Sequence, residues 1–146
     1  MNKANKSGQF LENRVENFFV SKKIEIIRYK DFNELDCFHP KCLIKRVPFI
    51  DVFGRLCYTE FVFHNEFGTD VRIECKNQDV RGSKEQALCY FLDSVPNMPE
   101  SLVCLLITGD GWDKKLLKSL TTKHSSKLKI FIGFESFSNY FNEILE

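Results

Sequence analysis

Apolar residues follow two kinds of spacing along the chain, and these predict helices and strands in alternation. A recurrence every three to four residues predicts helices over 7–21, 83–95, 112–120 and 136–145. Runs rich in β-branched and aromatic residues predict strands over 23–29, 43–49, 57–65, 69–77, 101–108 and 127–134. Strands that alternate with helices favour parallel pairing, whereas the short "EFG" connection predicts an antiparallel hairpin. We therefore expect an α/β fold in which helices pack on a mixed sheet.

The apolar positions of three segments define the expected core. In the first helix, which Ser7 can cap, they are Leu11, Val15, Phe18 and Phe19. In the second helix they are Leu88, Phe91, Leu92 and Val95. In the hairpin, alternation places on the core side Phe61, Phe63, Ile73 and Cys75.

Composition narrows the class of protein. A length of 146 residues is enough for one core and too short for two, so we expect a single domain over 1–146. A net charge of +1 argues against binding by bulk charge, so any basic surface for nucleic acid must be local. Six scattered cysteines favour reduced thiols and a cytoplasmic location. The longest apolar run, "LVCLLI", is too short for a membrane span, and no membrane partner is expected.

The hairpin places charges on the face opposite its core side. If the turn is centred near Phe67, residues that face each other have numbers that sum to 134, so Glu60 faces Glu74 and Tyr58 faces Lys76. Two opposed carboxylates repel each other unless a proton or a cation lies between them. The register therefore predicts a cation site on this face.

A divalent metal ion fits that site. Carboxylate oxygens, a backbone carbonyl and waters suit a hard cation such as Mg²⁺ (or Mn²⁺), and the carbonyl of Cys75 is the expected backbone ligand. A lysine beside the metal can orient or help deprotonate the attacking water, as in phosphodiester hydrolysis. The simpler interpretation of Glu74 and Lys76 is a solvated strand face with a surface ion pair. The match in register with Glu60 favours the metal site.

The same residues resemble the PD-(D/E)XK nuclease superfamily. "YTEFVF" and "VRIECKNQ" are similar to the family's strand pair, in which one strand supplies an acid and the next an acid-x-lysine motif. "SGQFLENRVENFF" resembles its first helix, and "RGSKEQALCYFLDSV" resembles the helix after the lysine. The resemblance implies a restriction-endonuclease-like mixed sheet with an αβββαβ core flanked by helices, here with an extra C-terminal strand and helix. It is strongest to small bacterial and phage members.

The resemblance also implies a function. We expect a bacterial or phage-encoded, metal-dependent endodeoxyribonuclease, restriction-like or repair-like, with DNA as its partner and no organic cofactor. One domain carries one active centre, so cutting both strands of a duplex suggests a homodimer. The alternative is a catalytically inactive nuclease-fold protein that binds nucleic acid or a protein. Glu60 is one methylene longer than the family's usual Asp at this position, which keeps that alternative open.

Further site residues follow from the resemblance. The family's first helix often carries a metal-binding glutamate. Glu12 lies beside the buried stripe whereas Glu16 points further toward solvent, so Glu12 is the better candidate; the alternative is a first-turn acid that favours the helix dipole. Gln86 and Tyr90 match the Gln-x-x-x-Tyr spacing of RecB-type members.

Asp51 in "VPFIDVFG" is the alternative to Glu60 as the first acid. The competing interpretation is a turn residue beside Gly54. The hairpin register favours Glu60, because it would pair Asp51 beyond the end of the strand that carries Glu74.

Two more groups of residues are candidates for binding. Basic residues near the proposed site include Lys45 and Arg46, and the DNA contacts we expect are Arg55, Arg72, Arg81 and Lys84. "CFHPKC" suggests a structural zinc bound by Cys37, His39 and Cys42, with Cys57 or His64 as a fourth ligand, although this spacing is also that of an ordinary loop.

Overall fold

Six strands form one sheet whose spatial order follows the chain. The computed structural model describes residues 3–32, 40–65 and 69–145. The strands are β1 (Glu25–Arg28), β2 (Cys42–Ile50), β3 (Leu56–His64), β4 (Val71–Asn77), β5 (Leu102–Thr108) and β6 (Leu128–Ile132). The helices are α1 (Lys3–Ser21), α2 (Tyr29–Phe32), α3 (Lys84–Ser94), α4 (Lys114–Leu120) and α5 (Phe134–Leu145), with a 3-10 turn η1 (Val95–Asn97).

The sheet is mixed, as predicted. β2, β3 and β4 form an antiparallel meander, and β5 and β6 continue from β4 in parallel. β1 pairs with β2 in parallel at the other edge. The predicted αβββαβ order and the extra C-terminal strand and helix are confirmed.

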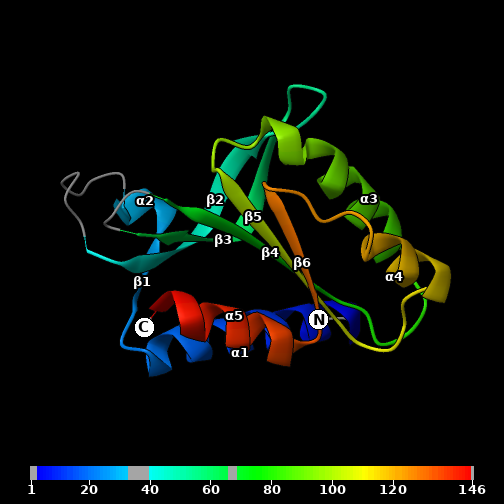
Figure 1. Cartoon of the computed structure of the whole chain (residues 1–146), viewed down its shortest axis with the longest axis horizontal. Helices are drawn as coiled ribbons and strands as arrows, with labels where there is room; N and C mark the ends of the chain where they lie inside the picture. Colours follow the sequence, from blue (N-terminus) through cyan, green and yellow to red (C-terminus); the bar gives the residue numbers. More distant parts are fainter. Residues whose placement is uncertain (1–2, 33–39, 66–68, 146) are drawn as a thin grey trace.

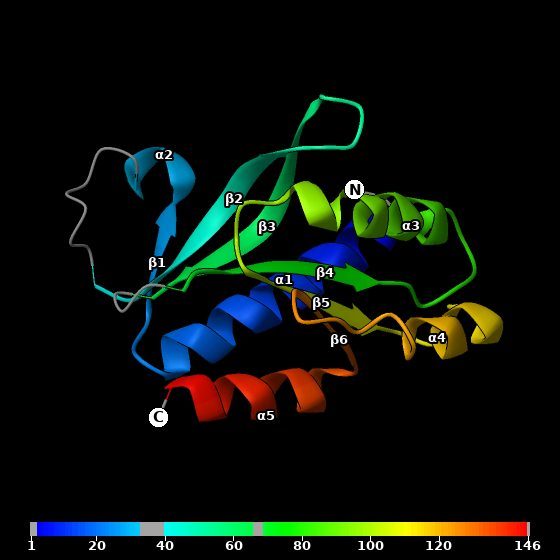
Figure 2. The same cartoon turned by 45° about the horizontal axis from the view of Figure 1, so that its top comes forward.

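Helices cover both faces of the sheet (Figures 1 and 2). On one face, α1 and α5 lie side by side, and the rings of Phe19 and Phe141 are 5.3 Å apart. On the other face, Leu88 and Phe91 of α3 and Leu120 of α4 pack on β5 and β6. The predicted stripes are confirmed, although Phe18 and Leu92 are only partly buried.

Most predicted boundaries differ from the structure by one or two residues, and the two at the ends of α1 and β1 have an identifiable cause. α1 begins at Lys3, so Ser7 lies inside the helix and does not cap it; the preceding residues include Ala and Lys, which favour helix. After α1 the chain turns through Lys23, whose φ is +63°, and Tyr29 already belongs to α2. The strand predicted over 23–29 is therefore shorter.

No helix in the described ranges is long and apolar enough to cross a membrane. The five cysteines in these ranges are free.

β3 and β4 pair over a short stretch and then separate. The pairs Phe61↔Ile73, Val62↔Arg72 and Phe63↔Val71 confirm the register in which facing numbers sum to 134. Beyond Phe61 and Ile73 the β2–β3 hairpin turns away from β4, as Figure 2 shows. We call this point of separation the fork. The predicted pairs of Glu60 with Glu74 and of Tyr58 with Lys76 are wrong, because the ladder ends before them.

At the fork, the side chains of β2 depart from strict alternation between the two faces of the sheet. Lys45 forms an ion pair with Glu16 of α1, whereas Val47 packs with Ile44 on the opposite face of the sheet. Strict alternation would place Lys45 and Val47 on the same face. The residue between them, Arg46, has a φ of +56°. This left-handed conformation costs a non-glycine residue about 1–3 kcal/mol, so the surrounding structure must hold it.

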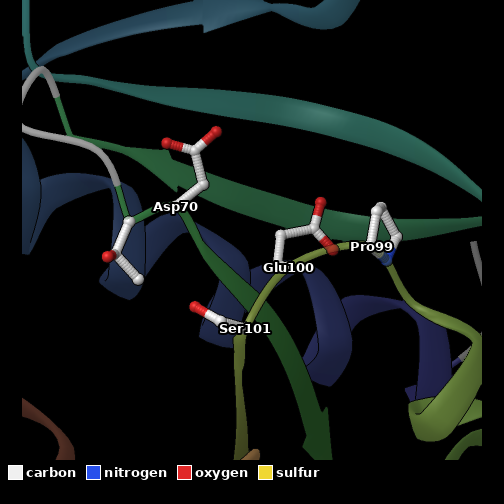
Figure 3. A pocket seen from close by; sticks show the side chains of 5 residues that line it. Asp70, Pro99, Glu100 and Ser101 are labelled. Atoms are coloured by element: carbon white, nitrogen blue, oxygen red, sulfur yellow. The ribbon is translucent and has the colours of Figure 1, made fainter.

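A hollow of about 500 Å³ lies at the opposite end of β4 from the fork (Figure 3). It is lined by Thr69, Asp70, Pro99, Glu100 and Ser101. Its two acids already have partners: Asp70 accepts from His64 and from the backbone N–H of Asn65, and Glu100 pairs with Arg72. Because these charges are satisfied within the protein, this hollow is a poor candidate for a functional site.

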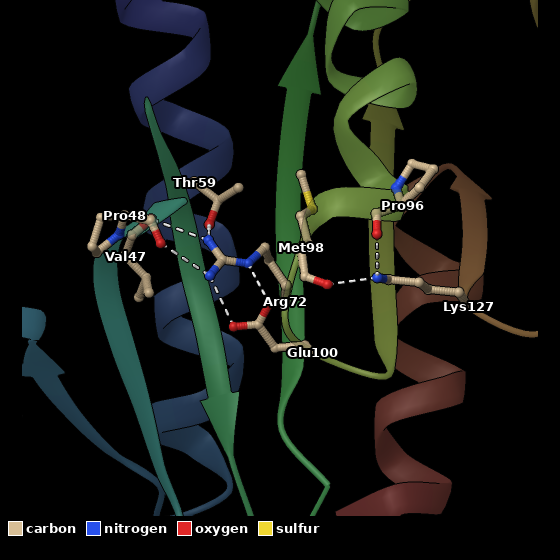
Figure 4. Close-up of polar contacts among 8 residues, drawn as sticks. All are labelled: Val47, Pro48, Thr59, Arg72, Pro96, Met98, Glu100 and Lys127. Atoms are coloured by element: carbon tan, nitrogen blue, oxygen red, sulfur yellow. Dashed lines mark hydrogen bonds and ion pairs between the residues drawn. The ribbon is translucent and has the colours of Figure 1, made fainter. Parts of the chain in front are cut away.

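Arg72 connects β4 to the diverging hairpin (Figure 4). Its side chain is 1% exposed, and its Nε and Nη2 donate to the carboxylate of Glu100 at 2.6 and 2.8 Å. Its Nη1 donates to Thr59 Oγ1 at 2.8 Å and to the carbonyl of Val47 at 3.2 Å, and its Nη2 also donates to the carbonyl of Pro48 at 3.1 Å. We call these five residues the Arg72 network. It holds both strands of the hairpin at a fixed position relative to β4.

We predict that Arg72→Met lowers the free energy of unfolding by about 3–5 kcal/mol, because it leaves the Glu100 carboxylate without its cation. Urea denaturation would measure this loss. The control is Arg28→Met, which breaks an exposed ion pair with Asp31 and should change stability by less than about 1 kcal/mol. Equal effects of the two substitutions would contradict a structural role for the network.

Candidate active site

Charged side chains from four elements meet at the fork. Glu60 is the first residue of β3 beyond its ladder with β4, and its Oε2 accepts from the backbone N–H of Cys75 at 3.5 Å. Burial raises the pKa of Glu60 to about 7; the charge of Lys76 on β4 opposes this rise, and that of Glu12 on α1 adds to it. Burial also lowers the pKa of Lys84 on α3, and this lysine feels the charges of Lys76, Glu12 and Glu60. The four side chains therefore lie within electrostatic reach of one another.

Glu12 is coupled by charge to the fork, and Glu16 is bound in an ion pair. Burial raises the pKa of Glu12, and Lys45, Lys76 and Arg46 lower it. Glu16, one turn further along α1, is bound to Lys45 Nζ at 2.5 Å. Glu12 is coupled to both Glu60 and Lys76, whereas the carboxylate of Glu16 is held by Lys45.

Glu74 is buried and incompletely satisfied. Its side chain is 4% exposed, and its Oε1 has no hydrogen-bond partner among the described residues. It shares a face of β4 with Lys76, because the two are separated by one residue. A buried carboxylate oxygen without a donor is costly, and a bound cation would remove that cost.

The donor set fits Mg²⁺ or Mn²⁺. Such ions use one or two carboxylates, and waters and substrate phosphate complete their coordination. Over the parts of the chain that the structure describes, no group of three or more His, Cys, Asp or Glu side chains is placed to hold a metal ion. The fork therefore suits an open site of this kind better than a closed structural site.

Gln78, which sequence analysis missed, connects the end of β4 to its neighbours. It is buried, its N–H donates to Thr108 of β5, and its side chain donates to the carbonyl of Gly111 at 3.0 Å and accepts from the N–H of Lys84. Gly109 has a φ of +95°, and a Cβ at Gly109 or Gly111 would overlap the 78–80 backbone. The "GDG" motif after a buried strand was the signal that backbones approach closely here.

The other expected DNA contacts differ in accessibility. Arg55 is exposed, and its Nη2 donates to the hydroxyl of Tyr90 at 2.7 Å. Arg81 is exposed and lies 3.4 Å from Asp113. Lys84 is half-buried, and its Nζ donates to the carbonyl of Asn77 at 2.5 Å, beside Lys76.

The prediction that Arg72 contacts DNA is wrong. Its side chain is 1% exposed, and its guanidinium donates to Glu100 and to three groups of the hairpin. A guanidinium that is buried and fully engaged cannot reach a phosphate outside the protein.

Gln86 and Tyr90 line a second hollow, of about 370 Å³, between α3 and the tip of the β2–β3 hairpin. Its other lining residues are Arg55, Ser83 and Ala87. The ring of Phe53, from the hairpin tip, stacks on Tyr90 with centroids 5.9 Å apart. Tyr90 therefore holds the hairpin tip against α3.

Asp51 has the role of a turn residue. It is 2% exposed, its Oδ1 accepts from the N–H groups of Phe53 and Arg55, and its Oδ2 accepts from Arg55 Nε. Burial alone would raise the pKa of Asp51, but the hydrogen bonds from Arg55 and Phe53 hold it below its ordinary value. These contacts use both carboxylate oxygens to stabilise the turn between β2 and β3.

The zinc hypothesis falls partly outside the described residues, which do not include Cys37 or His39. Cys42 is fully buried in β2, and burial raises the pKa of its thiol to about 12, so the thiolate that binds zinc is disfavoured there.

Comparison with known proteins gives one result. A family model described as PD-(D/E)XK nuclease superfamily domain matches residues 3–137. No curated protein and no solved structure gives a significant match. The matched range includes α1, the meander, α3, β5 and β6, and so contains every element that meets at the fork.

We predict that, in EDTA, the free energy of unfolding falls as the pH rises from about 4.5, the ordinary pKa of a glutamate, to about 7. Between these values the folded protein keeps a proton on Glu60 that the unfolded chain has released, so rising pH favours unfolding, and Glu60 contributes at most about 1.4 kcal/mol per pH unit to the slope. Glu12, whose pKa is also raised, acts in the same direction.

Urea denaturation at several pH values would measure this slope. Glu60→Gln should flatten it, whereas the exposed control Glu135→Gln should leave it unchanged. A slope that is the same in Glu60→Gln as in the wild type would contradict the sheltered position of this carboxyl group.

Proposed function

Because the chain belongs to the PD-(D/E)XK nuclease superfamily, we propose that it is a metal-dependent endodeoxyribonuclease that hydrolyses phosphodiester bonds in DNA. The observation that carries this proposal is the meeting of Glu60, Glu12 and Lys76 at the fork. The unsatisfied Oε1 of Glu74, on the same face of β4 as Lys76, supports it.

Glu60 and Glu74 would hold the divalent cation, Mg²⁺ or Mn²⁺, and Glu12 would join them from α1. The carbonyl of Cys75 is the proposed backbone ligand. The N–H and C=O of one strand residue point to the same side, and the N–H of Cys75 points to Glu60, so its carbonyl faces the open side of β4. A bound divalent cation supplies Lewis acidity at the phosphoryl oxygen and favours deprotonation of the attacking water.

Lys76 would position that water and stabilise negative charge. Its ammonium group lies within electrostatic reach of both Glu60 and Glu12, which orient it toward the site. A fixed positive charge beside the reacting phosphate stabilises the charge that develops on its oxygens. Gln78 would keep the end of β4, and with it Lys76, in a fixed position.

The proposed DNA contacts are Arg55, Arg81 and Lys84. Lys84 is the first residue of α3, Arg81 lies shortly before it, and Arg55 lies in the turn of the adjoining β2–β3 hairpin. Each chain would carry one active centre, so we propose a homodimer for cleavage of both strands.

We predict that Glu60→Gln, Glu74→Gln and Lys76→Ala each reduce cleavage of supercoiled plasmid in Mg²⁺ or Mn²⁺ by at least about 100-fold, because each removes a metal ligand or the positioning charge. EDTA should abolish cleavage by the wild type. The matched control is Lys114→Ala, which removes an exposed lysine of α4 and should retain activity.

The outcomes separate the assignments. Cleavage that survives Glu60→Gln but not Glu74→Gln would remove Glu60 from the metal site and leave Glu12 as its second carboxylate. Failure of the folded wild type to cleave plasmid, branched DNA or single-stranded DNA would overturn the nuclease proposal, and DNA binding without cleavage would then indicate an inactive binding protein.

A further inference from the structure

Arg46 occupies a position that the fold does not favour for arginine. Residue numbers that face each other on β2 and β3 sum to 106, so Arg46 lies opposite Glu60. The structure describes all residues of Cys42–Ile50. Within this strand, Arg46 is the one residue that has no partner across the ladder with β3. Its φ of +56° suits glycine or asparagine better than arginine, which makes Arg46 a candidate for a functional role.

Within the described ranges the guanidinium of Arg46 forms no ion pair, in contrast to two other basic side chains near the fork. Lys45 is paired with Glu16, and Arg72 with Glu100. Arg46 is exposed, and within the described ranges no carboxylate forms an ion pair with it. Its charge nevertheless reaches the fork, because it lowers the pKa of Glu12.

Tyr58 supports this guanidinium. The Cζ atom of Arg46 lies 5.0 Å from the centre of the Tyr58 ring, within the range of a cation–π contact. Tyr58 is 48% exposed and precedes Glu60 by two residues on β3. A guanidinium held on an aromatic ring keeps its N–H donors free, and its planar shape can bind two phosphate oxygens at once.

We propose that Arg46, supported by Tyr58, is a binding site for a phosphodiester group of the nucleic-acid backbone beside the cation site at the fork. This inference rests on the proposed function for the identity of the substrate. It adds a phosphate contact on the hairpin, across the fork from α3, so that the bound strand is held from both sides of Glu60.

The test uses Arg46→Gly. Glycine adopts a positive φ without strain, so the variant should be at least as stable as the wild type, and a loss of function would not come from unfolding. Binding to a short fluorescently labelled DNA duplex, and to its single strand, would be measured by fluorescence anisotropy in EDTA over a range of salt concentrations. We expect about tenfold weaker binding and a salt dependence that is smaller by about one phosphate contact.

Lys23→Gly is the matched control. Lys23 is also an exposed basic residue with a positive φ, of +63°, but it follows the far end of α1, whose last residue, Ser21, lies roughly 14 Å along the helix axis from Glu12. It should gain similar stability and leave DNA binding unchanged. Arg46→Asn, which also tolerates the left-handed conformation, repeats the test without glycine's flexibility.

Two results would overturn this inference: equal affinity and salt dependence in Arg46→Gly and Lys23→Gly, or no binding of DNA by the wild type at low salt. Because binding is measured without metal, it is independent of cleavage. Binding that depends on Arg46 in a folded protein that cleaves neither plasmid nor branched nor single-stranded DNA would support the phosphate site and overturn the nuclease proposal. Cleavage by the wild type, together with equal DNA affinity and salt dependence in Arg46→Gly and Lys23→Gly, would support the nuclease proposal and overturn the phosphate site.

Discussion

A buried guanidinium determines the geometry of this protein. Arg72 is taken out of water, so its donors must find acceptors within the fold, and these come from β2, from β3 and from the segment before β5. The acceptors on the hairpin lie beyond the last pair of the β3–β4 ladder, Phe61↔Ile73. The Arg72 network therefore connects the two sides of the fork and sets how far the hairpin opens.

The carboxyl groups at the fork are in an electrostatically unfavourable environment unless a cation binds there. Glu60 has no partner in the backbone ladder with β2 or in that with β4. Burial raises the pKa of its carboxyl group to about 7. One buried carboxylate oxygen of Glu74 has no hydrogen-bond partner among the described residues. Arg46 adds backbone strain at the same position. Unfavourable features of this kind gather at functional sites, where a ligand relieves them, and the stability that they cost is supplied by the two packed faces of the sheet.

Much of the fold could be predicted because its signals are local. Apolar spacing predicted the long helices and the strands, and the turn centre alone predicted the pairing of Phe61 with Ile73. The change of face at Arg46 could not be predicted, because arginine rarely adopts a positive φ and no glycine or asparagine stands beside it. The burial of Arg72 could not be predicted either. Arginine is usually exposed, and its partner Glu100 lies 28 residues away with no pattern that links the two.

β4 is paired along its whole length with β5 but along only part of its length with β3. Toward β5 its ladder continues to the pair Asn77↔Thr108, so Glu74 and Lys76 sit on backbone that is held along its whole length. Toward β3 the ladder ends at Ile73, which leaves the N–H and C=O groups of that edge without a strand partner. An unpaired edge inside a sheet is normally a liability, and here Glu60 covers it by accepting from Cys75. A cation that drew the Glu60 carboxylate toward itself would expose the same edge of β4 to substrate. The early end of the β3–β4 ladder therefore connects the fold to its proposed chemistry.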